Sequence, residues 1–157
     1  MDDRLFRDAM GKFATGVTVL TTENEGVPHG MTANGFMSVS LDPKLVVISI
    51  GHKAKFLEKV SASKKFAVNI LSEEQEQYSR HFSGRPGEDP VLFESLEGLP
   101  VLNGALAQIA CEVVSSHVEG DHTLLIGRVL DLKLEDKSPL LFFAGKYREL
   151  TQFEVVK

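Results

Sequence analysis

The sequence has a single cysteine and no hydrophobic run long enough to cross a bilayer. With Cys111 alone, neither an intramolecular disulfide nor a zinc-ribbon framework can form. No apolar stretch approaches the ~18 to 20 residues that a membrane-spanning helix needs. The acidic opening, MDDRLFRDAM, lacks the basic and apolar regions of a signal peptide. These absences predict a cytoplasmic protein with no membrane partner.

The common catalytic signatures are missing as well. There is no GxSxG nucleophile elbow, no Walker loop, no HExxH zinc pair, and no GxGxxG after the first predicted strand. The histidines stand at positions 29, 52, 81, 117 and 122, a spacing that matches no metal-ligand pattern. Cys111 falls on the apolar phase of a strand pattern, which favours a role in the core over one as a nucleophile. The sequence therefore argues against a metal site and a Rossmann dinucleotide site.

Size and charge narrow the class of protein further. A chain of 157 residues is expected to form one domain, 1–157, with a substantial core. The net charge of −5 argues against nucleic acid as the main partner, because phosphate binding along a duplex needs a basic stripe. A local lysine cluster could still seat one small phosphate; its members are Lys53, Lys55, Lys59, Lys64 and Lys65.

Three segments are predicted to be short helices. Residues 5–13 place apolar side chains on one helical face, namely Leu5, Phe6, Ala9, Met10 and Phe13. Residues 52–65 form a helix that carries the lysine cluster. Ser72 and Gln75 match a capping box, and the helix that they begin is expected to run to about His81.

The rest of the chain is dominated by strand patterns. These cover residues 17–22, 31–40 (as a short strand or an extended loop), 44–50, 66–71, 106–118, 123–134 and the start of 139–150. Residues 23–30 and Asp42-Pro43 have turn chemistry, and the Gly- and Pro-rich segment 83–104 is predicted to be a long loop. Because the strands follow one another as hairpins, a closed or nearly closed antiparallel barrel is favoured over a βαβ sheet. The expected fold class is mainly β (α+β).

One stretch, GMTANGFMSVSLDPKLVVISI at residues 30–50, combines small polar groups with a hydrophobic strand. Small side chains and backbone groups at 32–40 would let a planar ligand approach closely. Lys53 and Lys55, at the start of a predicted helix, offer an anion site beside it. A flat heterocycle with a phosphate tail would suit both regions. The alternative is that 31–40 is a kinked edge strand and the lysines a solvated helix face.

Several segments in order along the chain resemble the flavin reductase-like family. They are FRDAMGKFATGVTVLTT, HGMTANGFMSVSLDPKLVVISI, FAVNIL, GDHTLLIGRV and PLLFFAGKYREL. The resemblance implies an antiparallel FMN-binding split β-barrel with a few short helices, assembled as a homodimer. It also implies that NADH reduces bound FAD or FMN, and that the reduced flavin passes to the oxygenase of a two-component phenol or 4-hydroxyphenylacetate monooxygenase.

The resemblance also assigns roles to individual residues. Flavin binding is implied for Met31, Thr32, Ala33, Asn34, Ser49, Ile50, Gly51, Lys53, Ala54, Lys55, His81 and Phe82. Within this set, Met31 to Asn34 would contact the isoalloxazine ring, and Lys53 to Lys55 would close on the phosphate. His122 and Tyr147 would lie near the nicotinamide. No general acid or base is required, because hydride chemistry belongs to the two cofactors.

Other interpretations remain at this stage. A tightly FMN-binding electron carrier would need no nicotinamide pocket, and a relative of pyridoxamine-phosphate oxidases would share only the barrel. From the residues alone, His122 is a solvated turn residue and Tyr147 a packing residue. The sequence does not distinguish FAD from FMN as the flavin that is bound. It shows no clear arginine pair for a 2′-phosphate, which favours NADH over NADPH.

Overall fold

The protein is built around one large antiparallel sheet, seen in a computed structural model that describes residues 1–151. The last six residues of the expected domain 1–157 lie outside the described residues. In spatial order the sheet consists of β3 (Val27–Ala33), β2 (Thr18–Asn24), β6 (Lys65–Ile70), β9 (Ala107–Glu119), β10 (His122–Leu134), β5 (Lys44–Gly51) and β4 (Phe36–Leu41). Every pairing in it is antiparallel, as the hairpin pattern predicted.

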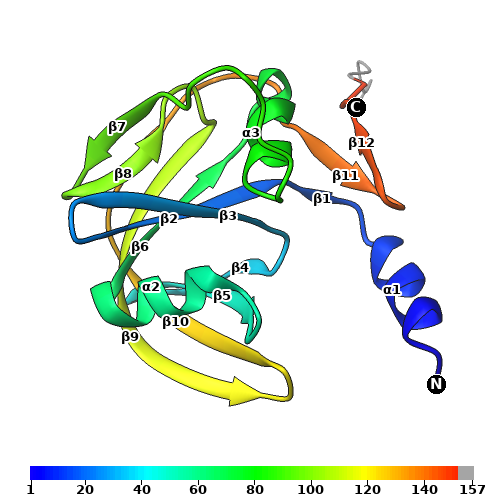
Figure 1. Cartoon of the computed structure of the whole chain (residues 1–157), viewed down its shortest axis with the longest axis horizontal. Helices are drawn as coiled ribbons and strands as arrows, with labels where there is room; N and C mark the ends of the chain where they lie inside the picture. The colour runs from blue at the N-terminus through cyan, green and yellow to red at the C-terminus, as the bar shows by residue number, and fades with distance from the viewer. Residues whose placement is uncertain (152–157) are drawn as a thin grey trace.

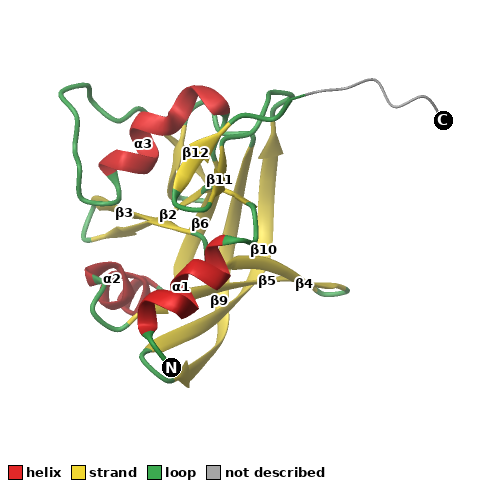
Figure 2. Ribbon diagram, turned by 90° about the vertical axis from the view of Figure 1, so that its right-hand side faces the viewer, coloured by secondary structure: helices red, strands yellow, loops and turns green. Residues whose placement is uncertain are grey.

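Smaller elements surround the large sheet (Figure 1). The helices are α1 (Asp3–Gly11), α2 (Lys55–Ser63), the 3-10 turn η1 (Glu73–Gln75) and α3 (Glu76–His81). The second sheet joins β1 (Thr15–Gly16), β11 (Leu141–Phe143) and β12 (Lys146–Arg148), and a separate hairpin pairs β7 (Phe93–Leu96) with β8 (Leu99–Leu102). In both Figure 1 and Figure 2, α3 lies above the β2–β3 hairpin and α2 below it.

The large sheet curls into an incompletely closed barrel. Its two edges are β3 and β4, yet only Asn34 and Gly35 separate these strands in the chain. A seven-stranded sheet whose edges are joined by two residues must bend round until those edges nearly meet. The joint is fixed to the neighbouring strand, since the Ser49 N–H donates to the Gly35 carbonyl at 2.8 Å.

The core fills the inside of this curled sheet. In β5 the buried Val46, Ile48 and Ile50 alternate with half-buried residues, which is the period-2 pattern of a strand with one face inward. Phe56 and Val60 of α2 complete the same cluster. Burial of large apolar side chains, each contributing about 1.5 to 3 kcal/mol, is the main source of stability.

A buried amide ties the β7–β8 hairpin to the barrel. Asn69 is fully buried, and its Nδ2 donates to the Val19 carbonyl at 2.9 Å and to the Thr21 hydroxyl at 3.0 Å. Its Oδ1 accepts the Leu102 N–H at 2.8 Å. A single side chain thus links β6, β2 and β8, and every polar atom in it is satisfied, as burial demands.

Three sequence expectations need correction. The predicted loop at 83–104 contains the β7–β8 hairpin. The predicted turn at 23–30 is only the two residues Glu25 and Gly26, and β3 begins directly after them. Residues 31–40 are not one element, because they hold the end of β3, the crossing at Asn34 and most of β4. In the first and second cases, a turn of Glu and Gly with positive φ at both residues (Glu25-Gly26, Glu97-Gly98) makes a two-residue hairpin possible.

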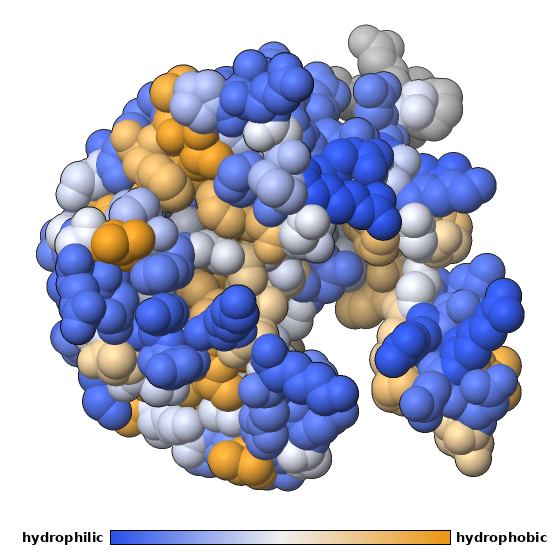
Figure 3. Space-filling model, in the orientation of Figure 1, coloured by the Kyte–Doolittle hydropathy of each residue, from blue (hydrophilic) through white to orange (hydrophobic). Residues whose placement is uncertain are grey.

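Helix α1 stands away from the barrel (Figure 3). The Asp2 carboxylate caps it by accepting the Arg4 N–H at 2.9 Å, and it ends at Gly11 rather than at the expected Phe13. Its apolar face is formed as predicted, but none of the helix is buried. Exposed side chains include Leu5 at 64%, Phe6 at 54%, Met10 at 57% and Phe13, just beyond the helix, at 79%.

The other two helices form where they were predicted, but the one predicted over 52–65 is shorter. It is α2, so of the lysine cluster it holds Lys55 and Lys59, while Lys53, Lys64 and Lys65 lie outside it. The Ser72 N–H donates to Gln75 Oε1 at 3.0 Å in the expected capping position. The helical segment that follows ends at His81. Among residues 1–151, no helix combines the length and apolar character that a bilayer crossing requires.

We expect Gly127→Ala to destabilise the fold. Gly127 lies in β10, and a Cβ there would come within 2.5 Å of the buried Phe66 ring and 3.0 Å of Cys111 Cβ. Overpacking of a core costs about 1 to 3 kcal/mol of unfolding free energy. Urea unfolding at fixed protein concentration measures the difference.

Gly16→Ala is the matched control, because a Cβ at this strand glycine meets no atom within 4 Å. Its unfolding free energy should change by less than about 1 kcal/mol. Equal losses in the two variants would contradict the proposed clash.

Candidate functional site

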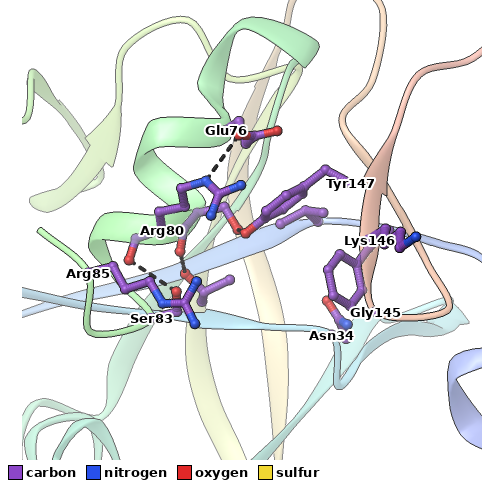
Figure 4. Close-up of a pocket in the computed structure, with 12 residues that line it drawn as sticks. Asn34, Glu76, Arg80, Ser83, Arg85, Gly145, Lys146 and Tyr147 are labelled. Carbon is purple, nitrogen blue, oxygen red and sulfur yellow. Dashed lines mark hydrogen bonds and ion pairs between the residues drawn. The ribbon is translucent and has the colours of Figure 1, made fainter. Parts of the chain in front are cut away.

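A cavity of about 540 Å³ opens between the end of β3, helix α3 and the β11–β12 hairpin (Figure 4). This volume falls in the range of about 300 to 1,000 Å³ that is typical of small-molecule sites. Its lining residues are Val17, Thr32, Asn34, Glu76, Ser79, Arg80, Ser83, Arg85, Phe142, Gly145, Lys146 and Tyr147.

The floor of the cavity is the end of β3, which is bonded to α3 and the residue after it. The Thr32 hydroxyl donates to the Ser79 carbonyl at 2.6 Å, and the Thr32 N–H donates to the Phe82 carbonyl at 3.1 Å. Asn34 follows where the chain leaves the strand, and its side chain is exposed at the cavity. Within residues 1–151 the structure gives its amide group no hydrogen-bond partner, so both its donor and its acceptor are available to a ligand.

Tyr147 of β12 forms the opposite wall. Its hydroxyl and the Ser79 hydroxyl are 2.7 Å apart, and its ring packs edge-to-face on Phe142 at a centroid distance of 5.3 Å. The Arg80 guanidinium lies 5.0 Å from the ring centroid, within the range of a cation–π contact. Three contacts thus fix the orientation of the tyrosine.

The cavity is cationic although the whole chain is acidic. Arg80, Arg85 and Lys146 line it, whereas Glu76 is the one acidic residue among its lining residues. Glu76 Oε2 accepts a hydrogen bond from Arg80 Nε at 3.0 Å, one helical turn along α3. The remaining positive charge favours an anionic ligand, because oriented cations in a partly enclosed site are screened less than on an open surface.

The residues predicted at 31–34 divide between two faces. Thr32 and Asn34 line the cavity, as expected for contacts with a ring system. Met31 packs against the core, and Ala33 is buried with its carbonyl accepting the Thr18 hydroxyl at 2.6 Å. This division follows from the alternation of side chains along β3. Met31 and Ala33 could therefore contribute backbone groups only.

A second predicted group assembles at the end of β5. Residues 49–51 pair with the start of β10, where His122 lies opposite Gly51. Ile50 is completely buried, so its side chain faces the core rather than a ligand. Lys53 and Lys55 are exposed, and Ala54 occupies the N-cap position of α2. The Ser49–Gly35 backbone bond joins this group to the crossing at Asn34.

His81 and Phe82 lie beside the main cavity without lining it. The Phe82 ring packs on Gly30 so tightly that a Cβ there would stand 2.7 Å from it. The Phe82 carbonyl nevertheless anchors Thr32. His81 faces a separate recess of about 50 Å³ on the other side of α3.

His122 and Tyr147, expected together near the nicotinamide, belong to different parts of the surface. His122 Nδ1 lies 2.8 Å from Asp121 Oδ1 at the tip of the β9–β10 hairpin. This hydrogen bond and the accompanying charge interaction lower the pKa of the Asp121 carboxyl. Nearby, His52 Nε2 is 3.0 Å from the Thr123 hydroxyl and the His52 N–H donates to the Asp121 carbonyl at 2.9 Å, so the segment after β5 holds the tip of this hairpin.

Sequence reasoning missed most of the charged lining. Arg80, Arg85, Glu76 and Lys146 were not among the candidates, and neither was Ser79. One signal was present: Glu and Arg at i and i+4 on a predicted helix form an ion pair that orients the arginine. Nothing local showed that the segment around Lys146 would face them.

Among residues 1–151, no three His, Cys, Asp or Glu side chains gather as a metal site. Cys111 is fully buried, and burial raises the pKa of its thiol to about 12. Its place in the main core cluster confirms the predicted role in the core.

The structure is thus a curled antiparallel barrel with a cationic, aromatic-walled cavity beside the end of β3. Comparison with known proteins identifies the family: residues 10–151 match the flavin reductase like domain, and the chain belongs to this family.

Three relatives indicate how close the similarity is. An NADH-dependent flavin reductase from a Rhodococcus species is 49% identical over 148 residues, which cover 92% of this chain and 84% of the relative. The reductase component of 4-hydroxyphenylacetate 3-monooxygenase from Thermus thermophilus is 38% identical over 146 residues, covering 92% and 95%. The solved structure of flavin reductase PheA2 in its native state aligns with a TM-score of 0.93 and 64% identity, covering 97% and 100%.

We expect the Asp121 carboxyl to titrate below the ordinary pKa of an aspartate. An imidazole is protonated at the acidic pH where carboxyl groups titrate, so its hydrogen bond and charge favour the carboxylate. The pair therefore favours the folded protein above the ordinary carboxyl pKa, and this benefit is lost as the pH falls through the lowered value.

An NMR titration of the Asp121 side-chain carboxyl measures its midpoint. In His122→Ala the midpoint should return toward that of an ordinary aspartate. If the substitution leaves the midpoint where it was, the pairing of the two side chains is not what sets it.

Proposed function

We propose that this protein is an NADH-dependent flavin reductase that reduces FAD or FMN and supplies the reduced flavin to the oxygenase of a two-component, phenol-type aromatic monooxygenase. The observation that carries the proposal is the cavity, in which a polar floor, a fixed tyrosine and a set of cations face one another. Family membership and the names of the relatives support the reaction and the kind of partner.

The residues present fit a flavin. Thr32 and Asn34 offer hydrogen-bonding groups beside a backbone that runs close to Ser49 with no bulky side chain between. At Gly51 the strand end is open, since a Cβ there would meet only His122, at 3.6 Å. Ser49 and the Ile50 and Gly51 backbone would line the ribityl chain. Lys53 and Lys55, with the first N–H groups of α2, would bind its phosphate.

The protein's contribution to the reaction is positioning. When bound, NADH supplies the hydride and the flavin accepts it. Thr32 and Asn34, in the floor of the cavity, hold the flavin. Tyr147, fixed by Ser79 and Phe142, limits where the nicotinamide can lie. His122 is proposed to orient the nicotinamide carboxamide from the hairpin tip. The activation barrier for hydride transfer is then lowered by the orientation of the two coenzymes and by exclusion of water. No side chain is required as an acid or a base.

The proposed assembly is a homodimer in the cytoplasm. The apolar face of α1 supports a second copy as its cover, because contiguous exposed apolar side chains on a soluble domain are typical of interaction surfaces. Covering this helix would bury residues next to the β11–β12 wall, so dimerisation and flavin affinity should be linked.

The alternative function is an electron carrier that holds FMN tightly and exchanges electrons with a protein. A carrier needs one cofactor site, whereas here two cationic groups lie on either side of the crossing at Asn34. The presence of both groups, the cations of the cavity and the lysines beyond β5, favours an enzyme with two substrates.

Anaerobic mixing of the purified protein with excess FAD and NADH tests the enzyme. We expect rapid loss of the flavin absorption over many turnovers, and the same assay with FMN and with NADPH ranks the substrates. If the flavin stays oxidised and remains bound after gel filtration, the carrier function is correct instead.

His122→Ala should raise the KM for NADH about two- to tenfold, which corresponds to the loss of about one net hydrogen bond. Steady-state kinetics at saturating flavin measure this change. The control is His117→Ala on β9 of the same hairpin, where the imidazole contacts Ser115 at 3.2 Å. A KM unchanged in His122→Ala would remove its role in NADH binding.

A further inference from the structure

Two arginines lie at the same rim of the cavity, a placement that no sequence pattern predicted. Arg80 lies in the last turn of α3, which ends at His81, and Arg85 follows after a short loop. The Arg85 N–H donates to the Arg80 carbonyl at 2.9 Å, and the Ser83 hydroxyl donates to the same carbonyl at 3.0 Å. Because both bonds converge on one oxygen, the loop is closed and the two arginines are brought together. Figure 4 shows both side chains directed from α3 toward the β12 side of the cavity.

Arg80 is held in place before any ligand arrives. Its Nε donates a hydrogen bond to Glu76, and its Cζ lies 5.0 Å from the centroid of the Tyr147 ring. Of the guanidinium N–H groups, only Nε is used in the hydrogen bond to Glu76. Within the described part of the chain, neither the terminal Nη groups of Arg80 nor the Arg85 guanidinium takes part in an ion pair. Several N–H donors therefore remain available at the cavity.

Such an arrangement suits a phosphate group. A guanidinium presents its N–H groups as a planar fork that matches phosphate oxygens, and charge-assisted hydrogen bonds of this kind are strong. Lys146 adds a third cation from the opposite wall. A single carboxylate lines this cavity, that of Glu76, and Arg80 already engages it. A pyrophosphate, with its two negative charges, fits this set of donors.

The position of the arginines relative to the lysines indicates which coenzyme's phosphate groups the arginines bind. Lys53 and Lys55 lie beyond the end of β5, on the far side of the Asn34–Gly35 crossing, and the flavin phosphate is assigned to them. We propose that Arg80 and Arg85 bind the pyrophosphate of NADH, and that Glu76 is a positioning residue which keeps Arg80 directed at it. This inference rests on the proposed function.

Hydride donors with and without phosphate test the arginine pair. The assay is the anaerobic reduction of riboflavin, a flavin without phosphate. The hydride donor is either NADH, which carries a pyrophosphate, or N-benzyl-dihydronicotinamide, which carries no phosphate. In Arg85→Ala we expect kcat/KM for NADH to fall about tenfold or more, since a hydrogen bond to a charged group is lost. With the benzyl donor the rate should equal that of the wild type.

Arg148→Ala is the matched control. Arg148 is exposed on β12 and lies over Phe143 at 5.7 Å, outside the cavity lining. The substitution removes the same charge from the same region, so NADH kinetics should stay unchanged. An equal loss in Arg148→Ala would show that overall charge attraction, not a phosphate contact, is responsible, and would overturn the proposal.

Glu76 is tested by rescue. In Glu76→Ala the KM for NADH should rise with kcat preserved, because Arg80 loses the acceptor that orients it. Glu76→Gln keeps an oxygen that can accept from Arg80 Nε and should restore most of the affinity. A Glu76→Ala variant that loses activity equally with both donors would indicate a structural role only and overturn the positioning role.

The remaining outcomes separate this inference from the function on which it rests. A wild-type protein inactive with both donors contradicts the reductase function itself. An active wild type whose NADH kinetics are unaffected by Arg85→Ala contradicts the phosphate contact alone. If Arg85→Ala weakens FMN but not riboflavin at constant NADH, the arginines bind the flavin phosphate instead. An effect with NADPH but none with NADH would place the contact at the 2′-phosphate, which also overturns the proposal.

Discussion

The crossing at Asn34 and Gly35 is the constraint on which the rest of the structure depends. An ideal Cβ at Gly35 would lie 2.9 Å from Ser49 Cβ and 3.0 Å from its carbonyl oxygen, a separation that side chains do not tolerate. Only a glycine lets the chain pass this close and bond to Ser49. That passage carries the chain from one edge of the sheet to the other. The small residues around it are therefore needed for closure of the barrel, and they also leave a surface that a flat ligand can reach.

The same crossing divides the candidate site into two charged halves. On one side the β3 end meets α3, where Thr32 is bonded to Ser79 and the arginine pair follows. On the other side Ser49 leads to the end of β5, to Lys53 and to Lys55 at the start of α2. A protein of net charge −5 thus places two arginines and a lysine at one cavity, and two further exposed lysines lie beyond the end of β5. Under the proposed function, these two groups would face the phosphates of the two coenzymes.

The sequence predicted the strands and helices that are determined by residues close together in the chain. Alternation marked β2 and β9, a short apolar run marked β5, and a capping pair marked the helical segment that ends at His81, because these features depend on residues near one another in the chain. The β7–β8 hairpin was missed since Gly and Pro dominate its surroundings, although Glu97-Gly98 is the turn that such a hairpin needs. Within the site, Thr32 and Asn34 came from the resemblance to a family. Arg80 and Arg85 could not be found this way, because their approach depends on a loop closed onto one carbonyl oxygen, and Tyr147, which Arg80 contacts, is far away in sequence.

The two walls of the cavity are held in different ways, although Phe82 on one side and Phe142 and Tyr147 on the other pack on the same core cluster. The floor and α3 are joined by side-chain and backbone hydrogen bonds from Thr32. The β11–β12 wall is attached through a two-residue pairing with β1, the hydroxyl contact of Tyr147 with Ser79, and a bond from the Ala144 N–H to the Gly11 carbonyl at 2.9 Å. The last of these connects the wall to α1, the helix whose apolar face is exposed. A second subunit that covered α1 would consequently fix the tyrosine wall as well. In such an assembly the packing of two copies would determine how well hydride donor and acceptor are aligned.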